Sequence, residues 1–585
     1  MTAQTRSASV LRDPRWSLVG LSAGFLYAIL GFLAFEPLAW WPLAVAAPMP
    51  LMALALVLST RTRRARWRAS VGAWVGSLPL WVLTHAWIFQ VSPVGFFPGM
   101  LLQGAWAGLF VLLASLALRG RRGPVSVAFT LALVWSFVEV FRGSVLFGGY
   151  PWLLIGHPII DAPLVALAGA VVGAYGVGFV VAISSAGVAV LARSGAPWHR
   201  GFLVFLLPWP GLWALGLLAP SVGEAAGVRV ALIQTNVPQD NRMRWSIEDQ
   251  VRLFEDFANL TLSARGRADL VVWPETMLPG PPISTQALAV MRAYGLAYAT
   301  NIEGLEHLPA TAFADGALAL HEDLGVPMLV GAVGVQNLRL DIDTTGGVVE
   351  QRDALFNSVH LFAQGRLSDT RYDKLRLTIF GEVLPLVSRW DWLERMLLFV
   401  GAGGMAFDLD AGEAPQWFDV PMSRGRTLRV GTPICFEVAS AGVCRTLSRG
   451  GGQRVDALVN VTNDGWFATS DAGRAMHLRL ARWRALENGV PIVRAANTGI
   501  SAFIDARGRI HPAEYEPSTS ANGNAYRTGG VVFAPRSAQV VLGEVPGVTR
   551  TPTPWSHAGY LIPWALGLIG LIVVTLGILA GRGRA

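Results

Sequence analysis

Hydrophobic residues are distributed unevenly along this chain of 585 residues. Long apolar runs crowd its first 220 residues and recur near its C-terminus. A helix that crosses the hydrocarbon core of a bilayer, about 30 Å thick, needs roughly 20 apolar residues. The apolar runs therefore predict eight transmembrane helices, at about residues 17–35, 37–59, 70–90, 95–118, 124–142, 163–192, 201–219 and 558–580. A buried core helix is the alternative for any single run, but eight runs together favour a membrane domain.

The middle of the chain, residues 221–555, has a different pattern. Short apolar runs that end in polar residues or proline predict strands buried on both faces, and they lie at residues 228–238, 268–279, 326–334, 427–437 and 457–467. Apolar residues at helical spacing predict helices over 246–266 and 472–489. In the first helix, Ser246 and Asp249 resemble a capping box with Asp in place of Glu. This alternation of strands and helices predicts a layered α/β domain.

Composition agrees with a division into three segments. The chain is 52% hydrophobic and 15% charged, with a mean hydropathy of +0.44, whereas soluble chains carry about 25% charged residues. We therefore expect a membrane domain of seven helices over residues 1–220. An extramembrane α/β domain over 221–555 follows it, and a C-terminal transmembrane helix with a short tail occupies 556–585.

The placement of arginine predicts the orientation in the membrane. Arginine clusters precede the first span, follow the second, fourth and sixth spans, and end the chain, so that an even number of crossings puts them all on one side. The positive-inside rule makes that side the cytoplasm, and the α/β domain then lies on the opposite face. The membrane segments hold 16 arginines and 4 acidic residues, which leaves 31 of the 47 basic and 35 of the 39 acidic residues to the middle segment. The basic excess therefore follows from membrane orientation, and we expect no nucleic-acid partner.

The chain has two cysteines, Cys435 and Cys444. Disulfides persist outside the cytoplasm, so a bridge that closes a small loop is one reading of this pair. Their spacing is not C-x-x-C, and no second Cys/His pair accompanies them, so we expect no zinc site or other metal. The other reading is that Cys435, at the end of a predicted strand, is a nucleophile.

Functional side chains of α/β folds lie mostly where strands end and the chain turns out of the sheet. Three predicted strand ends carry candidates: Glu275 in "VVWPET", Cys435 in "TPICFE", and Asn463 with Asp464 in "TNDGWF". Lys374 follows a further strand-like run. Taken singly, a turn-capping glutamate and a solvated surface lysine are the more ordinary readings.

Three of these segments together resemble the nitrilase superfamily: "VVWPET" its glutamate motif, "YDKLRLTIFGE" its lysine motif and "ICFE" its cysteine motif, in the same order. With the membrane spans, nearly the whole chain is similar to the apolipoprotein N-acyltransferase family. The segments "GGYPWLLIGH", "FGEVLPL", "NDGWF" and "RALENGVPIVRAANTGISAFID" add to the likeness. Phe436 stands where many relatives carry Tyr, Gly465 replaces a commoner Ala, and residues near 300–325 read as an insertion. The resemblance implies a nitrilase-like αββα sandwich beside a polytopic α-helical membrane domain.

The residue types also suit acyl transfer on chemical grounds. A cysteine thiolate at position 435 attacks an ester carbonyl, forms a thioester and passes the acyl group to an amine. Glu275 is the expected general base, and Lys374 is expected to stabilise the oxyanion beside the backbone N–H groups of Cys435 and Phe436.

Supporting roles fall to further residues of the same motifs. Glu382 is expected to hold Lys374 or the amine through charge-assisted hydrogen bonds. Glu437 either supports the site or is a structural carboxylate at a helix start, and Asn463 is a supporting residue at its strand end. Cys444 is then a small buried side chain.

A lipid substrate requires contacts with the bilayer. Trp152, Trp245 and Trp466 are the candidates for guiding acyl chains, against the ordinary reading of core or belt packing. Segment 387–405 is the candidate lid. Glu139 and Arg142, near the end of the fifth span, are charged residues within the membrane segment, either functional or a helix-end pair.

The resemblance implies a phospholipid:apolipoprotein N-acyltransferase of the bacterial inner membrane, with its catalytic domain in the periplasm and both termini in the cytoplasm. It implies a phospholipid donor and a diacylglyceryl-cysteine lipoprotein acceptor, no cofactor, and a monomer. A membrane-anchored amidase of nitrilase type, which hydrolyses a C–N bond, is the alternative, although one span would suffice to anchor it. A transporter or scaffold is a third class, for which paired charges or broken helices within the spans are expected.

Overall fold

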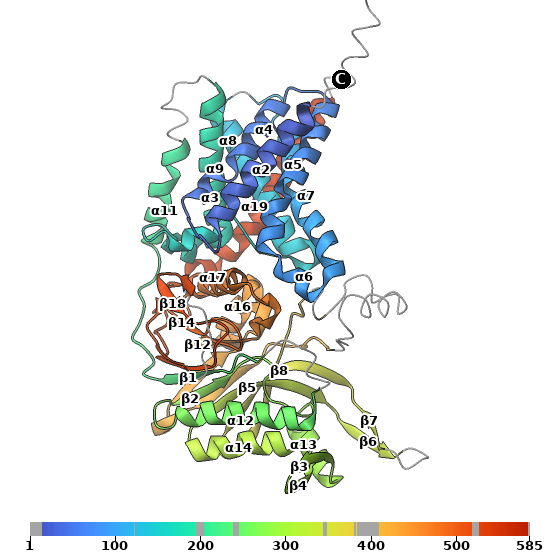
Figure 1. The fold of residues 1–585 in the computed structure, drawn as a ribbon. Coiled ribbons are helices and arrows are strands. Elements are labelled where there is room, and N and C mark those ends of the chain that lie inside the picture. The colour runs from blue at the N-terminus through green and yellow to red at the C-terminus, as the bar shows by residue number, and fades with distance from the viewer. Residues whose placement is uncertain are drawn as a thin grey trace, which may run out of the picture. The chain divides into compact units, whose positions relative to one another are not determined.

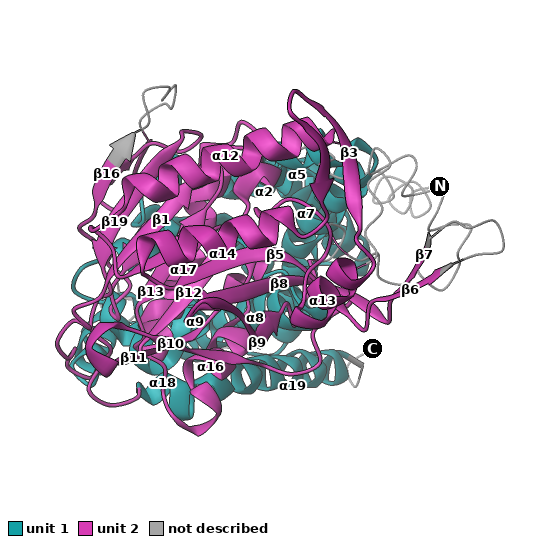
Figure 2. Ribbon diagram, turned by 90° about the horizontal axis from the view of Figure 1, so that it is seen from below, with its two compact units in different colours: residues 1–219, 553–585 teal, residues 220–552 magenta. Residues whose placement is uncertain are grey.

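The computed structural model describes residues 15–121, 123–194, 204–237, 245–342, 348–378, 382, 409–517 and 526–582. The chain divides into two compact units, one made of residues 1–219 and 553–585 and the other of residues 220–552 (Figure 2).

The first unit is helical. Its main helices are α2 (Arg15–Ala34), α3 (Leu43–Ala46), α4 (Met49–Leu58), α5 (Arg63–Thr84), α6 (Trp87–Val91), α7 (Pro93–Ala117), α8 (Pro124–Val140), α9 (Gly169–Ser194), α11 (Pro208–Gly216), α18 (Pro554–His557) and α19 (Ile562–Arg582) (Figure 1). Within the described ranges, five helical segments are long and apolar enough to cross a membrane, by length and composition alone. They are Arg15–Ala34, Pro93–Ala117, Pro124–Gly148, Ala166–Arg193 and Gly559–Gly581.

The expected count of eight spans is not confirmed. The predicted span 37–59 forms the two short helices α3 and α4, between which Pro48 interrupts the chain. The predicted span 70–90 falls on α5, whose first turns hold arginines. Part of the predicted span 201–219 lies outside the described residues, and its described part contains α11.

Helices α2 and α5 pack closely because glycine faces main chain across their contact. A Cβ at Gly20 would overlap the carbonyl oxygen of Ala69, and a Cβ at Gly24 would overlap that of Ala73. Small residues allow such close backbone approach between membrane helices.

The second unit contains two large sheets. The seven-stranded sheet has the order β16–β19–β1–β2–β5–β8–β9, and the six-stranded sheet the order β10–β11–β12–β13–β14–β15. The strands of the first sheet are β1 (Arg229–Gln234), β2 (Leu270–Trp273), β5 (Met328–Gln336), β8 (Ala354–Ala363), β9 (Arg366–Asp373), β16 (Glu514–Pro517) and β19 (Gln539–Glu544). Those of the second are β10 (Trp417–Pro421), β11 (Thr427–Gly431), β12 (Ala457–Thr462), β13 (Ile492–Ala496), β14 (Ala502–Ile504) and β15 (Ile510–His511).

The two sheets and the helices that cover them form four layers, as the alternation of side chains along the strands shows. On β2, Leu270 and Val272 join a hydrophobic core that also contains residues of β11 and β12, so this face meets the other sheet. Val271 and Trp273 point the other way, into a core shared with α12 (Ile247–Ser263) and α14 (Ala312–Leu324). Helices α16 (Ala441–Ser448) and α17 (Asp471–Asn488) supply residues to the core of the second sheet. The unit is therefore an αββα sandwich, as Figure 1 also shows.

The five predicted strand segments correspond to β1, β2, β5, β11 and β12, and the two predicted helices to α12 and α17. Ser246 accepts a hydrogen bond from the Asp249 N–H and donates one to the Asp249 carboxylate, so it caps α12 as predicted. Residues 300–325, which read as an insertion, are part of a hairpin, β3 (Ala297–Ile302) and β4 (Leu305–Pro309), followed by α14.

Candidate active site

The ends of several strands bring the predicted residues Glu275 and Lys374 together. Glu275 stands two residues after β2, and Lys374 comes directly after β9. Cys435 opens the short 3₁₀ helix Cys435–Ala439 that follows β11. These segments lie in both sheets, so packing of the sandwich creates the site.

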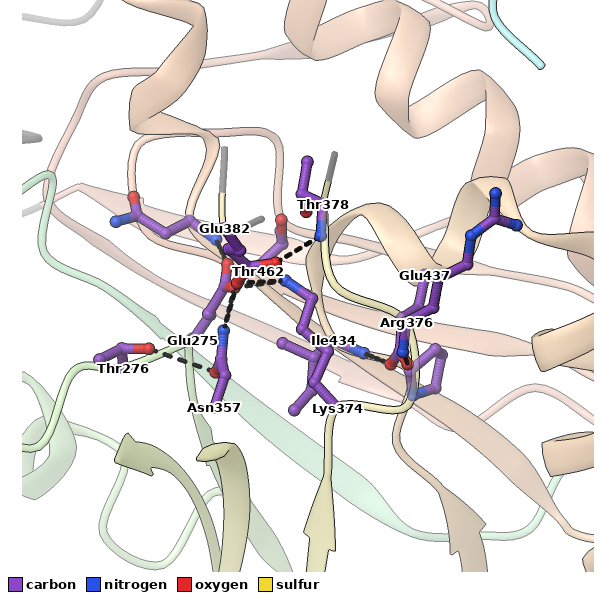
Figure 3. Close-up of polar contacts among 12 residues, drawn as sticks. Glu275, Thr276, Asn357, Lys374, Arg376, Thr378, Glu382, Ile434, Glu437 and Thr462 are labelled. Atoms are coloured by element: carbon purple, nitrogen blue, oxygen red, sulfur yellow. Dashed lines mark hydrogen bonds and ion pairs between the residues drawn. The ribbon is translucent and has the colours of Figure 1, made fainter. Parts of the chain in front are cut away.

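The buried ammonium of Lys374 lies between two carboxylates (Figure 3). Its Nζ is 2.8 Å from Oε1 of Glu382 and 3.3 Å from Oε1 of Glu275. Only 1% of the Lys374 side chain is exposed. The contact between Glu382 and Lys374 is the one expected from the sequence.

Hydrogen bonds fix the two carboxylates. Asn357 Nδ2 donates to Oε1 of Glu275 at 2.7 Å and to Oε1 of Glu382 at 3.2 Å. The N–H of Asn463 donates to the other Glu275 oxygen, Oε2, at 2.7 Å, and the N–H of Thr378 donates to Glu382 at 2.7 Å. Glu275 is therefore held at both oxygens in a single orientation.

Cys435 occupies an unusual backbone position. Its φ angle is +49°, a left-handed conformation that is uncommon for a residue with a Cβ and is often found at functional sites. The side chain is 8% exposed, and both cysteines are free and buried. The disulfide reading is therefore wrong, and Cys444 is a buried side chain, as expected for the other reading.

Glu437 connects the segments that carry Lys374 and Cys435. Its Oε1 accepts hydrogen bonds from the N–H groups of Leu375 and Arg376 at 2.8 and 3.0 Å. Its Oε2 accepts from the N–H of Ile434 at 2.8 Å and from the hydroxyl of Tyr372 at 2.9 Å.

Burial and charge set the electrostatics of the site. Burial raises the pKa of the Cys435 thiol, and the charge of Glu275 raises it further, while Lys374 lowers it. Burial alone would lower the pKa of Lys374, but Glu382 and Glu275 outweigh it, so the net effect is a raised pKa and a charged ammonium. Burial opposes ionisation of Glu382, but the charge of Lys374 holds the pKa of that carboxyl below its usual range. Burial raises the pKa of Glu437 to about 7, against its hydrogen bonds and the charge of Lys374.

The three candidate tryptophans belong to different segments of the chain. Trp152 is buried in the first unit, where its ring stacks on Tyr150 with centroids 5.9 Å apart. Trp245 is half-buried just before α12 and lines a cavity of about 450 Å³. Trp466 is half-buried in the turn Asp464–Phe467. Phe436 is partly buried against the core between the sheets.

Other predicted features are also located. The candidate lid, 387–405, lies outside the described residues. Glu139 and Arg142 both bind the following loop: Glu139 Oε1 accepts from the N–H of Ile155 at 2.8 Å, and Arg142 donates to the carbonyl of Trp152 at 2.6 Å. These contacts give the pair a structural role in holding that loop.

Sequence reasoning missed a polar residue within a strand and another just after one. Asn357 bridges two site carboxylates from within β8, and Asn497 donates to the side chain of Asn463 at 3.0 Å. For Asn357 the sequence offered only a group of polar residues within a strand-like run, "LFNSVHLF".

Comparison with known proteins identifies two matching families. The apolipoprotein N-acyltransferase N-terminal domain matches residues 27–187, and the carbon-nitrogen hydrolase family matches residues 229–520, which include all three predicted catalytic positions.

Similar proteins extend over most of the chain. An apolipoprotein N-acyltransferase from Azotobacter vinelandii is 30% identical over 524 residues, 85% of this chain and 87% of its own length. One from Caulobacter vibrioides is 28% identical over 525 residues, 87% of this chain and 84% of its own. A crystal structure of an amidase from Nesterenkonia sp. covers 58% of this chain and 95% of its own, with 14% identity and a TM-score of 0.32.

Proposed function

The chain belongs to the apolipoprotein N-acyltransferase family and is an acyltransferase, and from that premise we propose a reaction. The chain moves an acyl group from a phospholipid to the N-terminal amine of a diacylglyceryl-cysteine lipoprotein through a thioester on Cys435. The observation that carries this proposal is the buried ammonium of Lys374 between Glu275 and Glu382, with charges of all three groups acting on the Cys435 thiol.

The first half-reaction forms the thioester. Glu275 takes the thiol proton, and the Cys435 sulfur then attacks the ester carbonyl of the phospholipid. Lys374 stabilises the negative charge that develops on the carbonyl oxygen. The lysophospholipid leaves as an alcohol after Glu275 returns the proton.

The second half-reaction releases the acyl chain. The neutral amine of the lipoprotein attacks the thioester carbonyl and loses a proton to Glu275. The C–S bond then breaks as the amide bond is completed, and Glu275 returns the proton to the Cys435 thiolate. Because the donor product leaves before the acceptor reacts, this scheme predicts ping-pong kinetics. Glu382 keeps Lys374 in place throughout, supported by its 2.8 Å contact.

The proposal extends to location and partners. The arginine distribution supports a periplasmic position for the second unit and cytoplasmic termini. Trp152, Trp245 and Trp466 are proposed to guide the lipid substrates, and the chain is proposed to act as a monomer. Labelling of single introduced cysteines from either side of sealed vesicles tests the orientation, and light scattering in detergent tests the monomer.

The decisive experiment separates the two half-reactions. The full chain is incubated with phospholipid labelled in its acyl chains, then denatured in acid and analysed by peptide mass spectrometry. We expect an acyl group on the Cys435 peptide that hydroxylamine removes, no label in Cys435→Ala, and normal labelling in the matched control Cys444→Ala. Addition of a diacylated lipopeptide should discharge the label into an amide.

Two outcomes contradict the proposal. Acyl label that persists in Cys435→Ala removes Cys435 from the reaction. Release of free fatty acid without transfer to the lipopeptide, together with hydrolysis of small amides, favours the amidase alternative.

A further inference from the structure

Thr462 lies beside the proposed nucleophile. It is the last residue of β12, and the preceding residue, Val461, forms a parallel bridge with Ile434, the residue before Cys435. The two strand ends therefore run side by side at this point. Thr462 is fully buried, and the N–H of the next residue, Asn463, donates to Oε2 of Glu275 at 2.7 Å.

In the structure, the Thr462 hydroxyl binds a carboxylate two residues further along the chain. Its Oγ1 donates to Oδ1 of Asp464 at 3.0 Å. Asp464 is itself held by Arg494, whose Nη2 lies 2.8 and 3.0 Å from its two oxygens, and by Nδ1 of His477 at 2.9 Å. Asp464 therefore keeps its hydrogen bonds with Arg494 and His477 when the Thr462 hydroxyl turns away.

We infer that Thr462 is a further catalytic residue, whose hydroxyl turns from the Asp464 carboxylate to the Cys435 sulfur when the thiol loses its proton. This inference rests on the proposed function, since it assumes that Cys435 is the nucleophile. The thiol proton goes to Glu275, and Thr462 keeps its own proton and only redirects it. When the sulfur forms its bond to the acyl carbon, the sulfur loses its negative charge and the hydroxyl returns to Asp464.

The charges around the sulfur explain why such a donor is needed. Glu275 and Glu382 both disfavour a thiolate, and Lys374, which favours it, is engaged with both of these carboxylates. A neutral hydroxyl stabilises the thiolate without adding charge to the site. In agreement with this geometry, burial and Glu275 raise the pKa of the Cys435 thiol, whereas Lys374 and a hydrogen bond with Thr462 lower it.

The test uses two substitutions in the full chain. Thr462→Val removes the hydroxyl but keeps the shape of the side chain, and Thr462→Ser keeps the hydroxyl but removes the methyl group. The first measurement is the rate of alkylation of Cys435 by iodoacetamide from pH 7 to 10, followed on its own peptide so that Cys444 does not contribute. The second is the rate of thioester formation with labelled phospholipid. The thermal midpoint of each variant reports whether it folds.

We expect Thr462→Val to slow both rates roughly tenfold at pH 7 and to shift the alkylation profile upward by about one pH unit, the size of a lost hydrogen bond to a charged group. Thr462→Ser should stay within about threefold of the parent chain. The inference is overturned if Thr462→Val reacts as fast as the parent, or if Thr462→Ser is as slow as Thr462→Val. A parent chain that forms no thioester on Cys435 contradicts the proposed function instead, so the two failures are distinguishable.

Discussion

Glu437 gives the sharpest test of how the sandwich assembles its site. Its carboxylate accepts four hydrogen bonds: two from main-chain N–H groups just after Lys374, one from the N–H just before Cys435, and one from the Tyr372 hydroxyl. The perturbation is Glu437→Gln, which keeps the length of the side chain. The matched milder variant is Tyr372→Phe, which removes one of the four donors.

The structure gives the expected size of each effect. An amide has one oxygen, so Glu437→Gln leaves at least two buried donors without an acceptor, at about 1–3 kcal/mol each, for a total of about 2–6 kcal/mol. Tyr372→Phe leaves the carboxylate with three donors and costs about 1.5 kcal/mol. Because Glu437 aligns the Lys374 and Cys435 segments, and because a misplacement of about 1 Å costs roughly a hundredfold in rate, we expect thioester formation to fall about that much in Glu437→Gln.

The assay follows thermal unfolding of the detergent-solubilised chain by tryptophan fluorescence and thioester formation in parallel. A loss of 2–6 kcal/mol corresponds to a decrease in Tm of roughly 4–12 °C for a domain of this class, and Tyr372→Phe should lose roughly 3 °C. Thioester formation is measured well below either midpoint, so that unfolding does not account for lost activity.

One result would refute the reasoning. If Glu437→Gln unfolds and reacts like the parent chain, the carboxylate does not hold the two segments in register. Equal effects of Glu437→Gln and Tyr372→Phe would also contradict it, because the argument requires the main-chain donors to contribute most of the stabilisation.

Three further changes probe neighbouring contacts. Gly331→Ala would place a Cβ against the main chain beside Glu275, so we expect thioester formation to fall at least tenfold, while Gly442→Ala, which meets open space, should leave it unchanged. Asn357→Asp puts a third carboxylate beside two others and should reduce labelling of the nucleophile at least a hundredfold; a rate within threefold of the parent contradicts the bridging role. Burial opposes ionisation of Asp464, but its buried arginine and histidine partners lower the pKa of that carboxyl in the folded chain. The ionised carboxylate therefore stabilises the fold fully above the unfolded pKa of about 3.9, and this stabilisation is lost as the pH falls toward the folded pKa. The Tm difference between the parent and Asp464→Asn should therefore be constant from pH 5 to 7 and shrink below about pH 4; a difference independent of pH contradicts this.

The apolar runs predicted a layered α/β domain and five strands of its two large sheets, because these strands are buried on both faces. In β2, an unbroken "LVVW" has side chains in two separate cores, as a strand covered on both faces requires. The membrane unit was harder to predict. Proline at position 48 divides one apolar run into short helices, and arginines begin α5, so apolar length alone did not give the number of spans.

The site residues also differ in whether the sequence alone predicts them. Glu275, Lys374 and Cys435 could be chosen because each follows a strand and carries the chemistry that acyl transfer needs. Asn357 lies within β8 among other polar residues, so nothing in the sequence singled it out. Thr462 ends β12 beside Asn463 and Asp464, and a threonine at a strand end carries no distinctive chemistry by itself. The carboxylates that Asn357 binds lie 82 and 25 residues away in the sequence, so this contact depends on how the chain folds.

Glu437 shows why a local motif determines only part of such a site. Two readings of this residue were open from the sequence, a carboxylate at a helix start and a supporting residue of the site. Oε2 binds the N–H of Ile434, three residues earlier, which is the local helix-start contact. Oε1 binds the N–H groups of Leu375 and Arg376, more than sixty residues earlier, on the segment that carries the lysine. A carboxylate has two oxygens, so the local contact leaves the second oxygen available, and burial in the sandwich requires that oxygen to find a donor as well. The two readings are therefore compatible, and the same requirement for paired buried atoms joins the two halves of the site.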